Sequence, residues 1–243
     1  MAFWLNQLTW PQAEKQIERV PVALVPVGAT EQHGPHLPIG TDVFLAEKLA
    51  AMVSENTGAL VYPSVNFGYS WVWRDRVGTV SLEQPVLQKV LENIVQSVER
   101  YGIRLLVFVN GHEANSATLK YAVREIQDKT PVKVLGMFYP GWSKVYEDYM
   151  ETPTWNGMFH ACEFETSMML AACEELVYME QAVEEYPRRP LLYGMDNTSI
   201  GDLSKSGVYG NPKAATKEKG EKMLEIFARQ ITQIIIDCGY GQQ

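Results

Sequence analysis

Four short runs of apolar residues predict the buried strands of a sheet. They cover residues 20–28, 59–62, 103–110 and 132–138, and the run at 103–110 is the clearest of them. Each run is nearly continuous in apolar residues and does not alternate with polar ones, which is typical of parallel strands buried on both faces.

Segments with apolar residues at helical spacing separate and follow these runs. Thr41 or Asp42 can cap the first helix and Gly58 can end it. Strands that alternate with helices predict an α/β class, with a mainly parallel central sheet in an α-β-α layered fold, and we expect a single domain over residues 1–243. Helices are predicted at 42–58, 81–100, 116–128, 161–176 and 214–236, and loops at 140–157 and 186–212.

Composition and charge exclude several classes of function. The chain has 243 residues, with 29 acidic and 21 basic side chains, so its formal net charge is −8, which disfavours nucleic acid and anionic membranes as partners. No apolar run approaches the length of a membrane span, and residues 1–10 carry no signal-peptide pattern. Three cysteines without CxxC spacing indicate reduced thiols, and we expect a cytoplasmic protein.

The four histidines lie in three short segments, and each segment also contains carboxylates. Two of these segments follow predicted strands, at the sheet edge where α/β proteins bind ligands. Mixed imidazole and carboxylate ligands suit zinc, manganese or iron(II), and two ions that share a bridging carboxylate would use five such groups. Two residues have a second interpretation: Asp42 can be a helix cap, and His36 can serve only to shape its loop. The segments contain Glu31, His33, His36 and Asp42; His112 and Glu113; and His160, Glu163 and Glu165.

Four sequence segments resemble the creatininase (creatinine amidohydrolase) family of metal-dependent hydrolases. They read ATEQHGPHLPIGTD, NGHEANS, HACEFETSMML and GVYGNPKAATKEKG, in the order found in that family. The resemblance implies a dinuclear metal site, with Zn or Mn and Fe as a further candidate, in one α/β domain that assembles as a homohexamer. It also implies that Glu31 and His112 hold one ion, that His33 and Glu165 hold the other, and that Asp42 bridges them. His160 matches the family histidine that passes a proton to the leaving nitrogen.

The chain departs from the family pattern around the substrate. Creatininase reads His-Tyr-Glu-Asn-Ser where this chain has residues 112–116, so the water-activating glutamate of the family falls on Ala114. Glu113 and Glu163 are the candidates to replace it as general base. Asn156 and Gly157 stand near the family's creatinine-recognising tryptophan and aspartate, which disfavours creatinine as the substrate.

The aromatic stretch at residues 64–82 is a candidate substrate wall. Trp71 and Trp73 could stack on a flat ring, and Arg74 and Arg76 could pair with an anionic group, which would favour a phosphorylated or carboxylated substrate. Many family members have Glu-Glu-His in the place of Trp71–Trp73. The alternative interpretation is that these aromatics fill a subunit interface.

The leading hypothesis is therefore a hydrolase in which a metal-bound hydroxide attacks the carbonyl of a small cyclic or related amide, with His160 as proton donor. The same site could open a cyclic ketone such as an inosose, or deformylate a ribosylated pyrimidine. A protein in which metal only stabilises the fold is a third reading. A nucleotide-binding enzyme is disfavoured because the sequence has neither GxGxxG nor GxxxxGK[ST].

Overall fold

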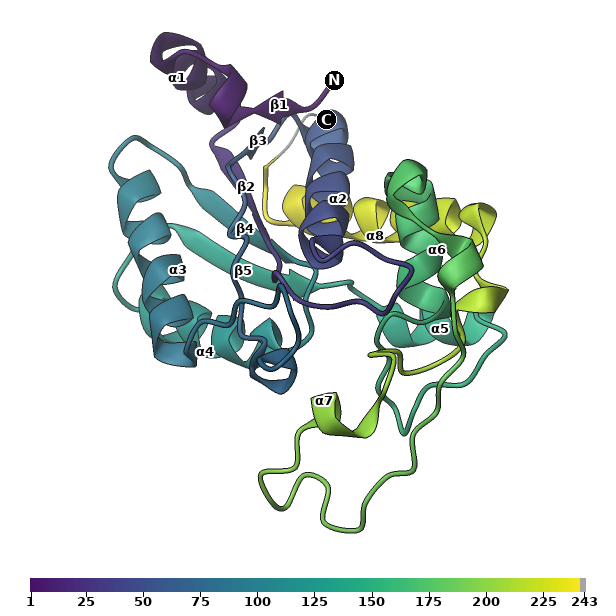
Figure 1. The fold of residues 1–243 in the computed structure, drawn as a ribbon. Helices are drawn as coiled ribbons and strands as arrows, with labels where there is room; N and C mark the ends of the chain where they lie inside the picture. The colour runs from purple at the N-terminus through teal and green to yellow at the C-terminus, as the bar shows by residue number, and fades with distance from the viewer. Residues whose placement is uncertain (241–243) are drawn as a thin grey trace.

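A five-stranded parallel sheet lies at the centre of the computed structural model, which describes residues 1–240 (Figure 1). The strand order is β1-β3-β2-β4-β5, so β2 and β4 are neighbours in the middle of the sheet. The α/β class and the parallel sheet are as predicted. The strands are β1 (Phe3–Trp4), β2 (Val22–Val27), β3 (Leu60–Val61), β4 (Leu105–Asn110) and β5 (Lys133–Phe138). The helices are α1 (Trp10–Arg19), α2 (Thr41–Thr57), α3 (Gln84–Glu99), α4 (Asn115–Gln127), α5 (Trp142–Tyr149), α6 (Glu163–Ala172), α7 (Ile200–Leu203) and α8 (Lys217–Asp237).

Helices cover both faces of the sheet. Successive residues of a strand point to opposite faces, so Val22 and Leu24 of β2 pack in one core while Ala23 and Val25 pack in the other. The first core lies under α2, α6 and α8, and the second under α1, α3 and α4. Every residue of β2 and of β4 is buried, which explains their continuous apolar runs.

The register of β2 and β4 sets the position of the polar loops. Val27 pairs with Asn110, so the two strands end side by side. Because the strands are parallel, the loops that follow them leave from the same edge of the sheet. That edge is where the sequence predicts a ligand site.

Several element predictions need correction. Residues 140–157 are not all loop, because α5 lies within them; it has only eight residues, of which Val145 and Tyr146 are buried. The helix expected at 161–176 ends at Ala172 and is followed by a 3₁₀ turn. The last helix begins at Lys217, where Thr216 accepts a cap hydrogen bond from the Lys219 amide, and not at residue 214. The elements β1, α1 and α7 were not predicted.

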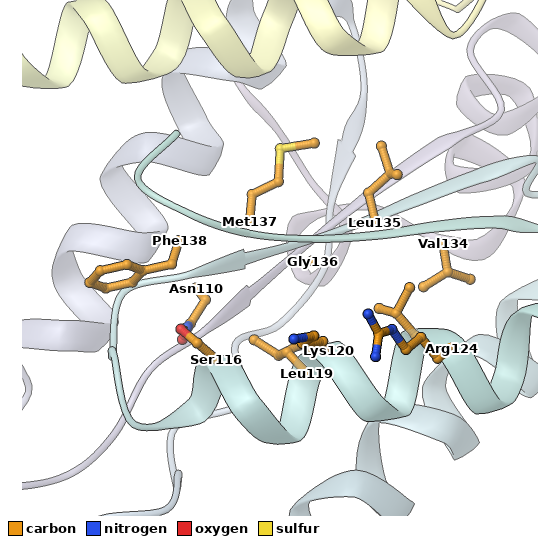
Figure 2. A pocket seen from close by; sticks show the side chains of 11 residues that line it. Asn110, Ser116, Leu119, Lys120, Arg124, Val134, Leu135, Gly136, Met137 and Phe138 are labelled. Atoms are coloured by element: carbon orange, nitrogen blue, oxygen red, sulfur yellow. The ribbon is translucent and has the colours of Figure 1, made fainter. Parts of the chain in front are cut away.

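Strand β5 is an edge strand and borders a groove away from the histidines. The groove has a volume of about 350 Å³. Figure 2 shows side chains of α4, among them Lys120 and Arg124, lying along one side of β5. Gly136 lies in the middle of the strand there. Among the helices of residues 1–240, we find none that combines the length and the hydropathy of a membrane span.

Candidate metal centre

Two glycines allow α2 to start directly against the ends of β2 and β4. A Cβ atom on Gly28 would lie 2.6 Å from the Val43 amide nitrogen, and one on Gly111 would lie 2.2 Å from the Asp42 carbonyl oxygen. Neither distance is compatible with a side chain. The first turn of α2 therefore carries Asp42 to the carboxyl ends of the two central strands.

The loop after β4 is held by asparagines. The Asn110 side chain accepts a hydrogen bond from the His112 amide at 3.1 Å and donates one to the His112 carbonyl at 2.7 Å. Asn115 donates to the Gly28 carbonyl at 3.0 Å and accepts from the Tyr69 amide at 2.9 Å. These contacts fix the His112 backbone beside the loop that follows β2.

A strained turn orients the third segment. Ala161 has a φ of 50°, a value that non-glycine residues seldom adopt, and its amide donates to Glu165 Oε2 at 2.6 Å. His160 forms an antiparallel bridge with Tyr209, and its ring stacks on Trp73 with centroids 4.6 Å apart. Backbone strain of this kind is commonly found at functional sites.

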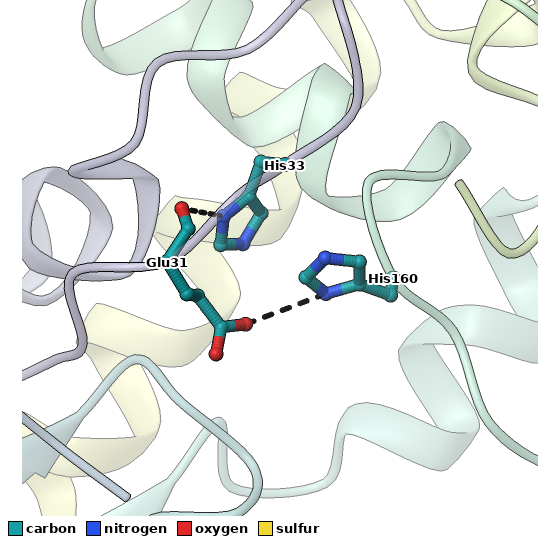
Figure 3. Close-up of side chains that lie close together, drawn as sticks. All are labelled: Glu31, His33 and His160. Atoms are coloured by element: carbon teal, nitrogen blue, oxygen red, sulfur yellow. Dashed lines mark hydrogen bonds and ion pairs between the residues drawn. The ribbon is translucent and has the colours of Figure 1, made fainter. Parts of the chain in front are cut away.

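These segments bring six of the predicted residues into one cluster. His33 Nε2 lies 3.2 Å from Asp42 Oδ1, and His112 Nδ1 lies 3.1 Å from Asp42 Oδ2. His112 Nε2 is 3.5 Å from Glu31 Oε2. Figure 3 shows Glu31 close to both His33 and His160, with a dashed line from Glu31 to each ring. His160 Nδ1 lies 3.6 Å from Glu31 Oε1. The sixth residue is Glu165.

The cluster contains three groups that could hold a metal ion. Within each group, one ligand atom per residue lies within 4.8 Å of the others. Two of the groups share Asp42, which is the division into two sites that the sequence resemblance implies. The groups are Glu31, Asp42 and His112; His33, Asp42 and Glu165; and Glu31, His33 and His160.

Burial and missing partners test whether a metal suits this donor set. Each of the six residues is at most 7% exposed. Both carboxylate oxygens of Glu31, the Nε2 of His33 and the Oδ2 of Asp42 are buried and form no hydrogen bond of acceptable geometry; the polar atoms that face them belong to other members of the cluster. Buried polar atoms are normally paired, and oxygen and imidazole atoms left free together are the donors that zinc and manganese use. The residues therefore fit divalent ions.

The electrostatics of the cluster also favour a bound cation. Burial alone would lower the pKa of His33 and His112, but the neighbouring Asp42 and Glu31 carboxylates raise it to about 9 and about 10. Burial opposes the charge on Asp42 too, yet the two histidines lower its pKa. Burial raises the pKa of Glu165 to about 7. The carboxylates thus create a field that holds positive charge between them.

A cavity of about 380 Å³ opens beside the cluster. Trp73, Glu113 and Asn156 of the predicted residues line it, together with Glu31, His112, His160 and Glu165. The sequence interpretation missed three aromatic residues of the lining, whose residue type was their only signal because they lie in loops or a short helix: Trp142, Phe159 and Tyr193. It also missed the apolar Val72, Met158 and Ile200.

Three of the predicted substrate residues, Trp71, Arg74 and Arg76, lie outside the cavity lining. Arg74 sits 3.8 Å above the ring of Trp71 and donates to the Trp71 carbonyl, and neither side chain is part of the cavity lining. Arg76 donates to the carbonyls of Gly201, Ser204 and Lys205, so it joins two loops. The arginines therefore offer no support for an anionic substrate.

Glu163 does not line the cavity either, so it is not positioned to act as a general base. Its carboxylate pairs with Lys219 at 2.6 Å and accepts hydrogen bonds from the amide and hydroxyl of Thr152. Burial opposes its charge, but Lys219 and Thr152 outweigh burial and lower its pKa. Glu163 joins α6 to α8 and to the loop before the cavity.

His36 has the structural role considered for it. The ring is buried, and its Nε2 lies 2.9 Å from the Thr166 hydroxyl, which ties the loop after β2 to α6. Gln32, which the sequence interpretation passed over, lies against His160: its carbonyl oxygen is 2.9 Å from His160 Nε2.

Comparison with known proteins identifies relatives over nearly the whole chain. The family model Creatininase, described as creatinine amidohydrolase, matches residues 6–235. A creatinine amidohydrolase of Pseudomonas putida is 31% identical, with 96% of this chain and 95% of the relative covered. A mycofactocin precursor peptide peptidase of Mycolicibacterium smegmatis is 32% identical, with coverage of 87% and 82%. A 3-dehydro-scyllo-inosose hydrolase of Thermotoga maritima is 26% identical, with coverage of 96% and 83%.

Solved structures agree with the sequence relatives. A mutant creatininase described as Zn-Zn type superposes with a TM-score of 0.83 at 29% identity. A structure described as creatininase Mn gives the same TM-score and identity. Both alignments cover 98% of this chain and 98% of the other.

Proposed function

The chain belongs to the creatininase family of amidohydrolases, and from this premise we propose that it is a dinuclear metal-dependent hydrolase of a small cyclic or related amide. One observation carries the proposal: two candidate ligand groups share Asp42, and buried ligand atoms within them form no hydrogen bond of acceptable geometry. The zinc and manganese forms of the structural relatives support these two metals, with iron(II) as a further candidate.

In this proposal, Glu31 and His112 would hold one ion, His33 and Glu165 would hold the other, and Asp42 would contribute to both. Two ions bound in this way would supply an activated water and polarise the substrate carbonyl. The protein supplies the rest. Asn110 and the Ala161 amide keep His112 and Glu165 in position, so little reorganisation is needed when the substrate binds.

We assign proton transfer to His160 and Glu113. His160 lines the cavity, and the Gln32 carbonyl accepts a hydrogen bond from His160 Nε2–H, which leaves Nδ1 to face the reacting groups. In this role His160 would first take up at Nδ1 the proton that the attacking water releases and would then pass it to the leaving nitrogen. Glu113 lines the same cavity and, with Glu163 paired to Lys219, is the remaining candidate for the general base.

The cavity wall suggests the kind of substrate. Trp73, Trp142 and Phe159 offer aromatic surface to a flat ring, and Asn156 offers an amide for hydrogen bonding. Of the residues that form this lining in the described part of the chain, Glu113 is the charged one outside the cluster. We therefore favour a small uncharged amide.

A second candidate reaction is the hydrolytic opening of a cyclic ketone such as an inosose, on the same residues. The 3-dehydro-scyllo-inosose hydrolase among the relatives favours it. A metal site that only stabilises the fold explains the structure less well. Structural metal sites are fully ligated by the protein, whereas four residues of this cluster line a cavity.

Assembly and location are part of the same proposal. We propose a homo-oligomer, a hexamer by family resemblance, in the cytoplasm, where the three free cysteines would stay reduced.

Metal content tests the proposal. Protein purified without chelator should contain about two equivalents of Zn, Mn or Fe per chain by elemental analysis, and Asp42→Ala should lose both because the shared carboxylate is gone. Glu31→Ala should lose mainly one. Metal content near zero after Zn²⁺ and Mn²⁺ are added back would reject the mechanism, and loss of a single ion in both variants would reject the bridging role.

A further inference from the structure

The two ring nitrogens of His112 have different partners. Its Nε2 lies 3.0 Å from the Tyr69 carbonyl oxygen, whereas its Nδ1 lies 3.1 Å from Asp42 Oδ2. Glu31 Oε2 is farther from Nε2, at 3.5 Å. A carbonyl oxygen can only accept a hydrogen bond, so Nε2 carries a hydrogen and donates it to Tyr69. Nδ1 is then the ring atom that remains to bind a cation beside Asp42.

The Tyr69 carbonyl belongs to a segment that two side chains hold. The Tyr69 amide donates to Asn115 Oδ1 at 2.9 Å, and the Ser70 amide donates to Ser81 Oγ at 2.9 Å. The Ser70 amide and the Tyr69 carbonyl are parts of one peptide unit, which is planar, so a fixed N–H also fixes the direction of the C=O. Asn115 and Ser81 thereby direct the carbonyl at the His112 ring.

Asn115 is itself anchored to the central strands. It is fully buried, and its side-chain nitrogen donates to the Gly28 carbonyl at 3.0 Å and to Asn110 Oδ1 at 3.3 Å. Gly68 lets the segment approach it, because a Cβ atom there would lie 2.7 Å from Asn115 Oδ1 and 2.6 Å from the Gly28 carbonyl oxygen. The segment before Tyr69 is therefore pressed against a rigid part of the fold.

Building on the metal centre proposed above, we propose that Asn115 and Ser81 are positioning residues that hold the Tyr69 carbonyl so that the His112 ring presents Nδ1 to the metal ion. Histidine ligands almost always donate their other ring N–H to a carbonyl, a carboxylate or water, which fixes the tautomer and the orientation of the ring. Loss of such a partner typically weakens metal binding about 10–100-fold.

The positioning role predicts an effect on one of the two ions. Tyr69 contacts His112, a candidate ligand of the ion that Glu31 also holds. The other ion would be held by His33 and Glu165, which take no part in the hydrogen bonds of the segment 68–70 given above. The two binding steps should therefore respond differently when the segment is loosened.

Zn²⁺ binding at buffered free metal, with the bound metal measured by elemental analysis, tests this inference in Asn115→Ala. We expect one of the two binding steps to weaken about 10–100-fold and the other to stay that of the wild type. Ser81→Ala should weaken the same step by a smaller factor, because Ser81 is partly exposed and water can replace its hydroxyl. This second variant keeps the test decisive if Asn115→Ala does not fold.

Nitrogen NMR of the histidine rings gives a readout that does not depend on affinity. In two-bond ¹H–¹⁵N spectra of the zinc-loaded wild type, we expect Nε2 of His112 to carry the hydrogen and Nδ1 to bind the metal. Loss of the signals in His112→Gln would identify them.

Ser54→Ala is the matched control. Ser54 is also buried and also joins two backbone segments, since it accepts from the Phe3 amide at 3.0 Å and donates to the Ala59 carbonyl at 2.7 Å. This variant should melt at a lower temperature than the wild type, but both of its Zn²⁺ binding steps should be unchanged.

Four results would overturn the positioning role while leaving the metal centre intact: unchanged Zn²⁺ binding in every Asn115 or Ser81 variant that folds, equal weakening of both steps, the same weakening in Ser54→Ala, or a metal-bound Nε2 in the spectra. A wild type that binds no Zn²⁺ would overturn the proposed function and this inference together.

Discussion

Glu113 lines the cavity, where its carboxylate can contact a substrate, but it is not one of the candidate metal ligands. It follows His112 directly, in the short loop between β4 and α4, and it lines the cavity. It takes part in none of the three candidate ligand groups, so its charge stays available when those groups are engaged. This combination favours a role in proton transfer.

Glu113→Gln should therefore lower the turnover number about 10²- to 10⁴-fold on any cyclic amide that the wild type hydrolyses, because it removes a general base while keeping the size of the side chain. Its metal content should stay that of the wild type. Glu163→Gln is the matched control, and we expect it to keep its turnover per folded chain but to unfold at a lower temperature, since it breaks the contact with Lys219. Unchanged turnover in Glu113→Gln would rule out the base assignment.

At the scale of single residues, the sequence predicts which side chains belong to the site but not the directions in which they point. Histidines are rare in the chain and each accompanies carboxylates, so all six cluster residues could be named beforehand. Glu163 and Glu165 both lie in the first turn of α6, but two helical positions differ by about 200° in direction. One therefore faces Lys219 and the other the cluster. In the 3₁₀ turn Trp71–Trp73, the second tryptophan is likewise buried against His160 while the first meets Arg74.

At the scale of elements, the site depends on how closely α2 approaches β4. Gly111 permits that approach, because the Asp42 carbonyl occupies the space of its missing Cβ. The contact is between backbone atoms, which cannot move aside as a flexible side chain can. The position of the bridging carboxylate is thus fixed by a glycine on another element.

Gly111→Ala should consequently displace the first turn of α2 and weaken metal binding. We expect a loss of at least about 1–3 kcal/mol in the free energy of unfolding, as for other overpacked sites. Denaturant unfolding and elemental analysis would measure the two effects. Gly136→Ala in β5 is the control, since its Cβ would meet only side-chain atoms, at 3.6 Å or more, and should be tolerated. Full metal content in Gly111→Ala would contradict this account of the approach.

Elements with a strong pattern could be predicted from sequence, and those shaped by context could not. Strands β2 and β4 are buried on both faces, so their apolar runs were easy to identify. Strand β1 has two residues and exists through its pairing with β3, which no local pattern encodes. Helix α5 carries so few buried residues that its position depends on packing against α8 and the aromatic side chains nearby.

At the scale of the whole molecule, the candidate site exists only when the complete sheet has formed. Glu31, His112 and His160 come from segments that are far apart in the sequence, and β2 and β4 must pair before two of those segments meet. An unfolded chain cannot present these ligands together. Metal should therefore bind the folded state almost exclusively, which couples metal binding to stability.

Removal of metal by a chelator should lower the melting temperature for this reason. With free metal at about 100 times the dissociation constant, binding to the folded state contributes about 2.7 kcal/mol, which corresponds to roughly 5–10 °C for a domain of this size. Scanning calorimetry with EDTA, and again after Zn²⁺ or Mn²⁺ is restored, would measure the shift. In Asp42→Ala the chelator should change the melting temperature little, because the shared ligand is gone. An equal shift in this variant and the wild type would place the stabilising metal at a different site.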